Sequence, residues 1–324
     1  MLRFYTELLL WAAIPPLLLL VYYYDRVPSA PSLMRLLFFF ILGAISGFLA
    51  LNLELVFETV ANDVVDWQKM QRVFAGVMVR ELIEVGPIEE GCKLIAVLLP
   101  TYSLQRRYRF RSTSVFLFTI AVALGFTAEE NWIYLFHGTG STVERIISTP
   151  VHATFSAPWG YALGISIGSN IYLHRWQKLV ARAWLNGVIC HALVNVLSMS
   201  GRYPLPLRLL SYGLFPFLVW MFWRLEQFFR KLQGTQAIAL ISGRTPQQRL
   251  GQQALVLLAL VLAGNSLFGL FLLAKSLSFL NPSQLLFPDV ISFTLSRLLL
   301  NLSLGLLAWV IYRSLRRWGQ RRYF

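Results

Sequence analysis

Long apolar runs separated by short polar stretches extend over the whole chain. A helix of about 20 apolar residues can cross the roughly 30 Å hydrocarbon core of a bilayer. The pattern therefore predicts an all-α fold, a polytopic transmembrane helix bundle with about nine spans. The expected spans are residues 7–24, 36–57, 81–102, 113–136, 150–173, 179–199, 205–223, 254–274 and 290–312.

The polar connections between these spans are short. Residues 62–80 alternate charged and apolar positions at helical spacing, which predicts a helix along the membrane surface. Residues 227–253 form the longest polar connection, and no internal repeat is visible. We therefore expect residues 1–324 to form a single integral membrane domain.

Composition agrees with this pattern, and the distribution of basic residues predicts the orientation of the bundle in the membrane. Hydrophobic residues make up 56% of the chain and charged residues only 14%, which is typical of a membrane protein. The net charge of +14 would suggest nucleic acid in a soluble protein. Here most basic residues fall in alternate connections and in the carboxyl-terminal tail, so we expect a lipid environment and no nucleic acid. Because basic connections stay in the cytoplasm, the pattern predicts a cytoplasmic C-terminus and an external N-terminus.

Titratable and amide side chains inside the spans are concentrated in the third to sixth spans. They are Glu89, Glu90, Lys93, Glu130, Asn131, His152, His191 and Asn195. An ionised group near the centre of a membrane helix costs roughly 2.5 to 3.5 kcal/mol, so the carboxylates and the lysine together would cost on the order of 10 kcal/mol without partners. Such groups must pair with one another or have a function.

The spacing of these residues indicates one shared site. Glu89 and Lys93 are four positions apart and share a helical face, as do His191 and Asn195. The four spans run in alternating directions, yet each would bring its polar residues to the outer half of the bilayer. We therefore expect a four-helix catalytic core at residues 81–199, with additional transmembrane helices at residues 205–313.

Four segments also resemble, in order, the conserved blocks of the PrsW family of intramembrane proteases. That family is related to the CAAX prenyl proteases and to the Aph subunit of γ-secretase. The segments are GPIEEGCK at 86–93, GFTAEEN at 125–131, HATFSAPWGYALG at 152–164 and CHALVN at 190–195. The CAAX relatives have a histidine where Glu130 stands, so this chain follows the PrsW pattern at that position.

The resemblance implies an intramembrane endopeptidase. Either Glu89 or Glu90 would act as general base on a water, with His152, His191 and Asn195 around the reacting carbonyl. Supporting roles would fall to Lys93, Glu130 and Asn131. The implied substrate is a membrane-anchored protein, such as an anti-sigma factor or another single-pass protein, in a bacterial plasma membrane.

The sequence leaves the cofactor and two other functions open. His152, His191 and Glu130 could bind Zn²⁺, and PrsW-like proteins are often labelled metalloproteases, but the absence of an HExxH motif favours a glutamic-type site without a cofactor. A non-catalytic membrane scaffold would not need both glutamates. An ion- or proton-coupled transporter should show repeated halves, and none is visible.

Overall fold

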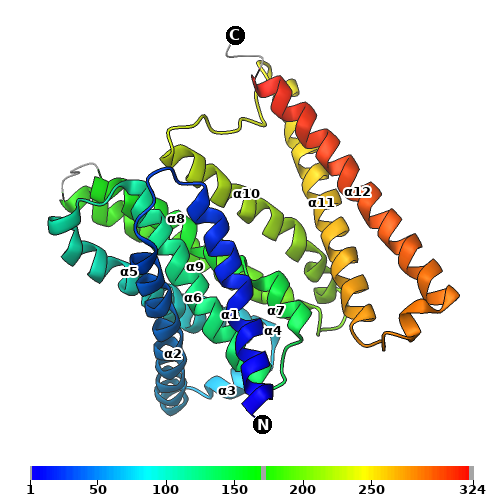
Figure 1. Cartoon of the computed structure of the whole chain (residues 1–324), viewed down its shortest axis with the longest axis horizontal. Coiled ribbons are helices and arrows are strands. Elements are labelled where there is room, and N and C mark those ends of the chain that lie inside the picture. The colour runs from blue at the N-terminus through cyan, green and yellow to red at the C-terminus, as the bar shows by residue number, and fades with distance from the viewer. Residues whose placement is uncertain (1, 169–172, 321–324) are drawn as a thin grey trace.

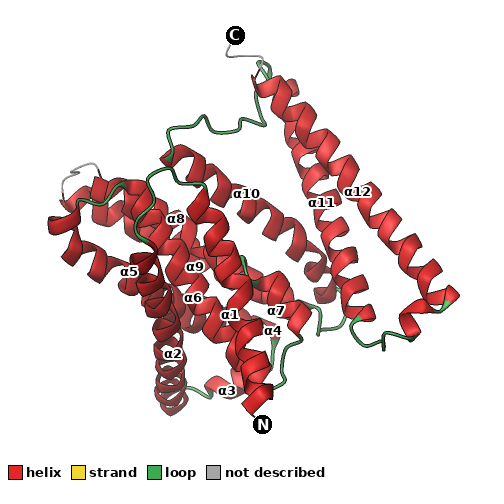
Figure 2. Cartoon of the chain, in the orientation of Figure 1, coloured by secondary structure: helices red, strands yellow, loops and turns green. Residues whose placement is uncertain are grey.

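A computed structural model describes residues 2–168 and 173–320. Within these residues the chain is helical, with no strand (Figure 2). The long helices are α1 (Leu2–Asp25), α2 (Leu33–Val64), α5 (Gly86–Tyr108), α6 (Ser112–Phe136), α8 (Val151–Gly168), α9 (Leu173–Ser200), α10 (Leu214–Leu232), α11 (Pro246–Leu277) and α12 (Pro288–Gln320). The short ones are α3 (Trp67–Met70), α4 (Phe74–Arg80), α7 (Thr142–Ser148), a π-helical segment Glu81–Val85, and the 3₁₀ segments Leu207–Gly213 and Gln284–Leu286.

The long helices confirm an all-α, polytopic membrane protein. Six of the described helices are long and apolar enough to cross a membrane, namely α1, α2, α6, α9, α11 and α12. Of the other three expected spans, two correspond to α5 and α8, whereas the span expected at residues 205–223 begins as a 3₁₀ segment and continues into α10, which ends at Leu232. Residues 169–172, at the end of the expected fifth span, and residues 321–324, in the basic carboxyl-terminal tail used to orient the chain, lie outside the described residues.

The expected surface helix at residues 62–80 is divided in the structure. Helix α2 continues to Val64, and the backbone then becomes extended at Val65. Asp66 begins α3 by accepting a hydrogen bond from the backbone N–H of Lys69 at 3.1 Å. A side chain that caps a new helix satisfies backbone groups that a continuous helix would bond internally. The result is two short helices, α3 and α4, that lead into the π-helical segment.

Helix α6 is the centre of the hydrophobic core. It packs against α1, α2 and α8, and its residues from Val115 to Leu124 are completely buried. Phe118 of α6 stacks on Phe39 of α2 with ring centroids 4.1 Å apart. This burial continues to Glu129 and Asn131 near the end of α6, whereas Glu130 is partly exposed.

Helices α2 and α6 approach so closely that their backbones touch. A Cβ atom on Gly43 of α2 would collide with the carbonyl oxygen of Val122, and one on Gly125 of α6 would collide with the carbonyl oxygen of Phe40. Small residues at a helix crossing allow this distance in membrane proteins. The crossing fixes α6 in position beside the helices that carry the polar cluster.

Figure 1 shows α11 and α12 as a hairpin beside the rest of the bundle, joined to it along α10. The N-terminus lies at the end of the molecule where α3, α4 and α7 lie, and the C-terminus lies at the opposite end. The side chain of Arg35 lies over the ring of Tyr108, 3.9 Å from its centroid, and Arg111 bonds to Ser29 at 2.7 Å. The first basic connections therefore meet at the end away from α7.

Replacing Gly43 with leucine should force α2 away from α6 and lower stability by about 1 to 3 kcal/mol, the usual cost of overpacking. Gly251→Ala on α11 is the matched control, because a Cβ there meets nothing within 4 Å. Thermal unfolding in detergent micelles measures the melting temperature of each variant. Equal melting temperatures for the two variants would contradict the close crossing.

Candidate active site

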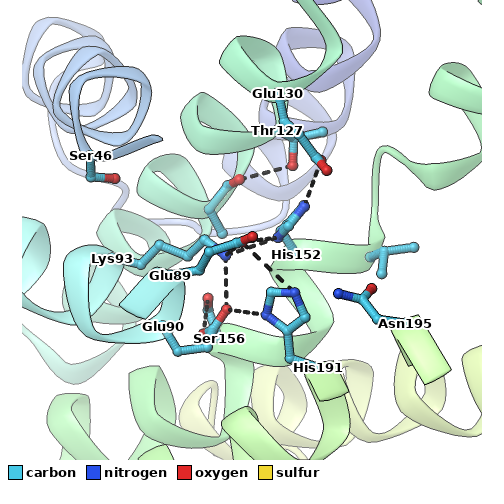
Figure 3. Close-up of polar contacts among 12 residues, drawn as sticks. Ser46, Glu89, Glu90, Lys93, Thr127, Glu130, His152, Ser156, His191 and Asn195 are labelled. Atoms are coloured by element: carbon cyan, nitrogen blue, oxygen red, sulfur yellow. Dashed lines mark hydrogen bonds and ion pairs between the residues drawn. The ribbon is translucent and has the colours of Figure 1, made fainter. Parts of the chain in front are cut away.

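The polar side chains of the central spans come together at the end of the bundle where α7 lies (Figure 3). Helices α5, α6, α8 and α9, which pack against one another, carry them. The cluster consists of Glu89, Glu90 and Lys93 on α5, Glu130 on α6, His152 on α8, and His191 and Asn195 on α9. Residues separated by more than a hundred positions thus share one site.

Lys93 lies at the centre of this cluster and is fully buried. Its Nζ donates hydrogen bonds to Glu89 Oε2 at 3.1 Å and to Glu90 Oε1 at 2.9 Å, and it lies 2.9 Å from His152 Nδ1. The ring of Phe126 is on another side, with its centroid 3.8 Å from Nζ. A charge taken out of water needs such partners, since desolvation otherwise costs several kcal/mol per ion. The lysine therefore makes two adjacent buried carboxylates possible.

Both carboxylate oxygens of Glu90 have polar partners. Its Oε2 accepts hydrogen bonds from Ser156 Oγ at 3.0 Å and from Trp159 Nε1 at 2.9 Å. Its Oε1 accepts the bond from Lys93 and lies 3.5 Å from His191 Nδ1. The side chain is fully buried. Glu90 is thus a fixed acceptor that ties α5 to α8 and α9.

Glu89 has a different environment. Successive side chains of an α-helix point about 100° apart, so Glu89 has no contact with Ser156 or Trp159, although it shares Lys93 and His191 with Glu90. Its Oε2 lies 3.8 Å from His152 Nδ1 and 3.8 Å from His191 Nε2. The side chain of Glu89 is 12% exposed, whereas that of Glu90 is fully buried. Of the two carboxylates, that of Glu89 is therefore the one that a water molecule can reach.

Each histidine is oriented by a second group. His152 Nε2 lies 2.8 Å from Glu130 Oε2, so the ring bonds to Glu130 on one side and faces Lys93 on the other. Glu130 in turn lies 3.6 Å from Arg145 Nη1 on α7. His191 stacks on the ring of Phe155, with centroids 4.4 Å apart. Both imidazoles are therefore fixed in orientation as well as in position.

The two expected amide residues have separate surroundings. Asn195 Nδ2 donates to Glu81 Oε2 at 2.8 Å, which leaves its second N–H free. Glu81 is buried in the π-helical segment, and such segments often mark functional sites. Asn131 is buried, and neither of its amide atoms has a hydrogen-bond partner among the described residues. Asn195 thus belongs to the edge of the cluster, and a role of Asn131 stays a prediction.

The region that carries this cluster matches a known family. The family described as "PrsW family intramembrane metalloprotease" matches residues 31–222, more than half of the chain. The chain belongs to the PrsW family. It is also 27% identical over 233 residues to a protein named Protease PrsW from Shouchella clausii (strain KSM-K16), a match that covers 68% of this chain and 96% of that relative. No solved structure matches the chain.

Because the chain belongs to the PrsW family, it is an intramembrane protease. Its environment is lipid, and its substrate lies in the membrane. All members of the polar cluster lie inside the matched region, while α11 and α12 lie beyond it. The family therefore supports the peptidase over the transporter and the scaffold.

The description of the PrsW family includes the word metalloprotease, and three side chains of this site could bind a metal ion. Glu89, His152 and His191 each offer a ligand atom within 4.8 Å of the other two. Two imidazoles and a carboxylate are a donor set that zinc accepts. The sequence pointed instead to Glu130 as the carboxylate. The structure places Glu130 on the other nitrogen of His152, which is where metal sites have their outer hydrogen-bond partner.

The position of Lys93 does not suit a metal. Its ammonium group lies 2.9 Å from His152 Nδ1 and 3.1 Å from Glu89 Oε2, so a positive charge already stands beside two of the three donors. Zinc would require Lys93 to withdraw, which its full burial and its bond to Glu90 oppose. The donor types fit zinc, while the arrangement of charges favours the site without it.

Three further residues belong to this PrsW site and were not expected in it. Trp159 is three positions after Ser156 and seven after His152, so helical spacing could have placed it on the same face. Glu81 reaches Asn195 from a π-helical turn, which the sequence does not reveal. Glu54 of α2 interacts electrostatically with Glu89 from outside the four-helix core.

Replacing Lys93 with methionine should leave two buried carboxylates without a counter-charge. Removing one partner of a buried ion pair costs about 3 to 5 kcal/mol, so we expect a large fall in the unfolding temperature. Arg106→Met, at an exposed position of the same helix, is the control for loss of one positive charge. Denaturation of both proteins in the same micelles measures the difference, and wild-type stability of Lys93→Met would contradict the central role of this side chain.

Proposed function

We propose that this PrsW family protease cleaves a peptide bond of a membrane-anchored protein with a water molecule activated by Glu89. The observation that carries the proposal is the position of Glu89 Oε2, which faces an imidazole nitrogen of each histidine and belongs to the more exposed of the two glutamates. We assign the catalytic core to residues 81–199, because α5, α6, α8 and α9 supply every member of the cluster.

The reaction divides between Glu89 and the groups around it. Glu89 Oε2 takes a proton from the water while the water oxygen attacks the carbonyl carbon of the scissile bond. The carbonyl oxygen becomes an oxyanion, and the free N–H of Asn195 and an imidazole N–H of His191 are placed to donate to it. When the C–N bond breaks, the proton on Glu89 passes to the leaving amine nitrogen. The base is thereby restored.

Lys93 and Glu90 prepare the base. The ammonium of Lys93 donates a hydrogen bond to Glu89 Oε2 and places a counter-charge beside this carboxylate. Glu90, with two donors on Oε2, keeps Lys93 in place rather than reacting. If zinc entered, Glu89, His152 and His191 would hold it, and the metal would supply Lewis acidity to the bound water.

We propose that the site opens toward the outer face of a bacterial plasma membrane. The N-terminus lies at the end of the bundle that carries the cluster, and the basic connections after α1 and α5 meet at the other end. Basic connections remain in the cytoplasm, which directs the site outward and the C-terminus inward. A suitable substrate is a single-pass protein cut near its outer end, such as an anti-sigma factor.

Glu89→Gln should reduce cleavage of single-span substrates in liposomes at least about 100-fold, since general-base catalysis contributes 10²- to 10⁴-fold. Substitution of either histidine with alanine should have an effect of similar size. Asp289→Asn, which removes an exposed carboxylate at the start of α12, is the control. Cleavage at the wild-type rate by Glu89→Gln would overturn the proposed base, and loss in Glu90→Gln alone would move the role to that residue.

Cleavage should persist in the presence of a zinc chelator, because Lys93 already supplies positive charge beside His152 and Glu89. The measurement is the initial rate in liposomes before and after dialysis against chelator, with zinc added back to one sample. Loss of activity that zinc restores would instead assign Glu89, His152 and His191 as ligands.

A further inference from the structure

The α11–α12 hairpin lies beyond the region that matches the PrsW family, yet it reaches the end of the bundle that carries the active site. The family match ends at residue 222, and α11 begins at Pro246. Among the described helices, α11 packs mainly against α12, α10 and the short helix α7. Its contact with α7 lies near its own carboxyl end, next to Lys275 (Figure 1).

A strong polar contact joins the hairpin to α7. Lys275 Nζ donates to Glu144 Oε1 at 2.6 Å. The other oxygen of Glu144 accepts the backbone N–H of Ser141 at 2.9 Å, which completes a capping box at the start of α7. Partial burial alone would raise the pKa of Glu144, but the hydrogen bonds from Lys275 and Ser141 outweigh this and hold it below its ordinary value. Glu144 therefore fixes the start of α7 and the hairpin at once.

The next residue of α7 points back into the active site. Arg145 Nη1 lies 3.6 Å from Glu130 Oε2, and the same Glu130 oxygen lies 2.8 Å from His152 Nε2. Adjacent residues of one seven-residue helix thus face opposite ways, Glu144 toward α11 and Arg145 toward the catalytic cluster. Any shift of α7 moves the charge that stands behind Glu130 and His152.

Arg145 depends on α7 for its position, because its own bonds are few. Its Nε and Nη1 atoms are buried without a hydrogen-bond partner among the described residues, and its guanidinium lies over the ring of Tyr134 at 4.3 Å. Helices as short as α7 are not stable alone. The capping box and the contacts with α1 and α11 are what hold it. Removing the contact with α11 should therefore loosen Arg145.

We propose that the carboxyl-terminal hairpin acts as a positioning arm for the protease site, with Lys275 and Glu144 as positioning residues that hold α7 and thereby Arg145, Glu130 and His152. The catalytic part of this proposal rests on the proposed function, whereas the mechanical part does not. The arm is a property of this chain that the matched family region does not contain.

The mechanical part is tested by amide hydrogen exchange of the full-length protein in liposomes. Lys275→Met should speed exchange of the α7 amides several-fold, and Glu144→Gln should do the same although glutamine can keep the capping box. Lys275→Arg should stay close to wild type, because it retains the charge. Arg297→Met on α12 is the matched control, since the side chain of Arg297 has only a ring contact with Phe293 among the described residues. Wild-type exchange in Lys275→Met would overturn the proposal.

The catalytic part is tested by kinetics with a single-span substrate. Lys275→Met should lower kcat roughly two- to fivefold, the size expected from a partly exposed ion pair that acts through orientation, with KM and melting temperature near wild type. Lys275→Arg should restore kcat. If the effect passes through Arg145, the double variant Lys275→Met, Arg145→Met should be no slower than Arg145→Met alone.

The outcomes separate the two proposals. Additive losses in the double variant, or an unchanged kcat in Lys275→Met while Glu89→Gln is inactive, overturn the positioning arm and leave the proposed base intact. Full activity in Glu89→Gln overturns the proposed base, and the exchange of the α7 amides then still decides whether the hairpin holds α7.

Discussion

An ammonium group buried among membrane helices is stable only where acceptors surround it, and Lys93 has three within 3.1 Å. Those acceptors come from its own helix and from α8, so the lysine can be satisfied only when the two helices are assembled. The carboxylates depend on it equally, since without a counter-charge they would have to give up their own charge or their burial. This mutual requirement joins the stability of the bundle to the chemistry of the site.

The different surroundings of the two adjacent glutamates follow from helix geometry. A turn of about 100° per residue sends Glu90 toward Ser156 and Trp159, where it is fully bonded, and sends Glu89 toward the two histidines. A fully bonded carboxylate is a poor base because its lone pairs are occupied. The less enclosed neighbour keeps a lone pair for water, while the same lysine donates a hydrogen bond to it.

The contacts that position His152 extend outward from the site, and they come from different parts of the chain. Glu130 fixes His152, and Arg145 stands behind Glu130 on a helix too short to hold itself. The outermost contact comes from a hairpin beyond the matched PrsW region. A protease core can accommodate such an addition without change to its reacting groups, because the hairpin packs mainly against α10 and α7 rather than against the helices that carry those groups.

The sequence by itself determined the class of protein, and it predicted the order of the spans and most of the polar cluster, though not Trp159 or Glu81, because apolar length and buried charge are properties of composition along one helix. The different directions of Glu89 and Glu90 also follow from helical periodicity, which is local. Only the tertiary structure decided that Glu89 faces both histidines, that Glu130 lies behind His152, and that Glu81 reaches Asn195. These contacts depend on how far each helix is rotated and shifted against its neighbours, and on a π-helical turn that changes the register before α5. Pattern along the chain does not encode those rotations, because packing between distant segments sets them.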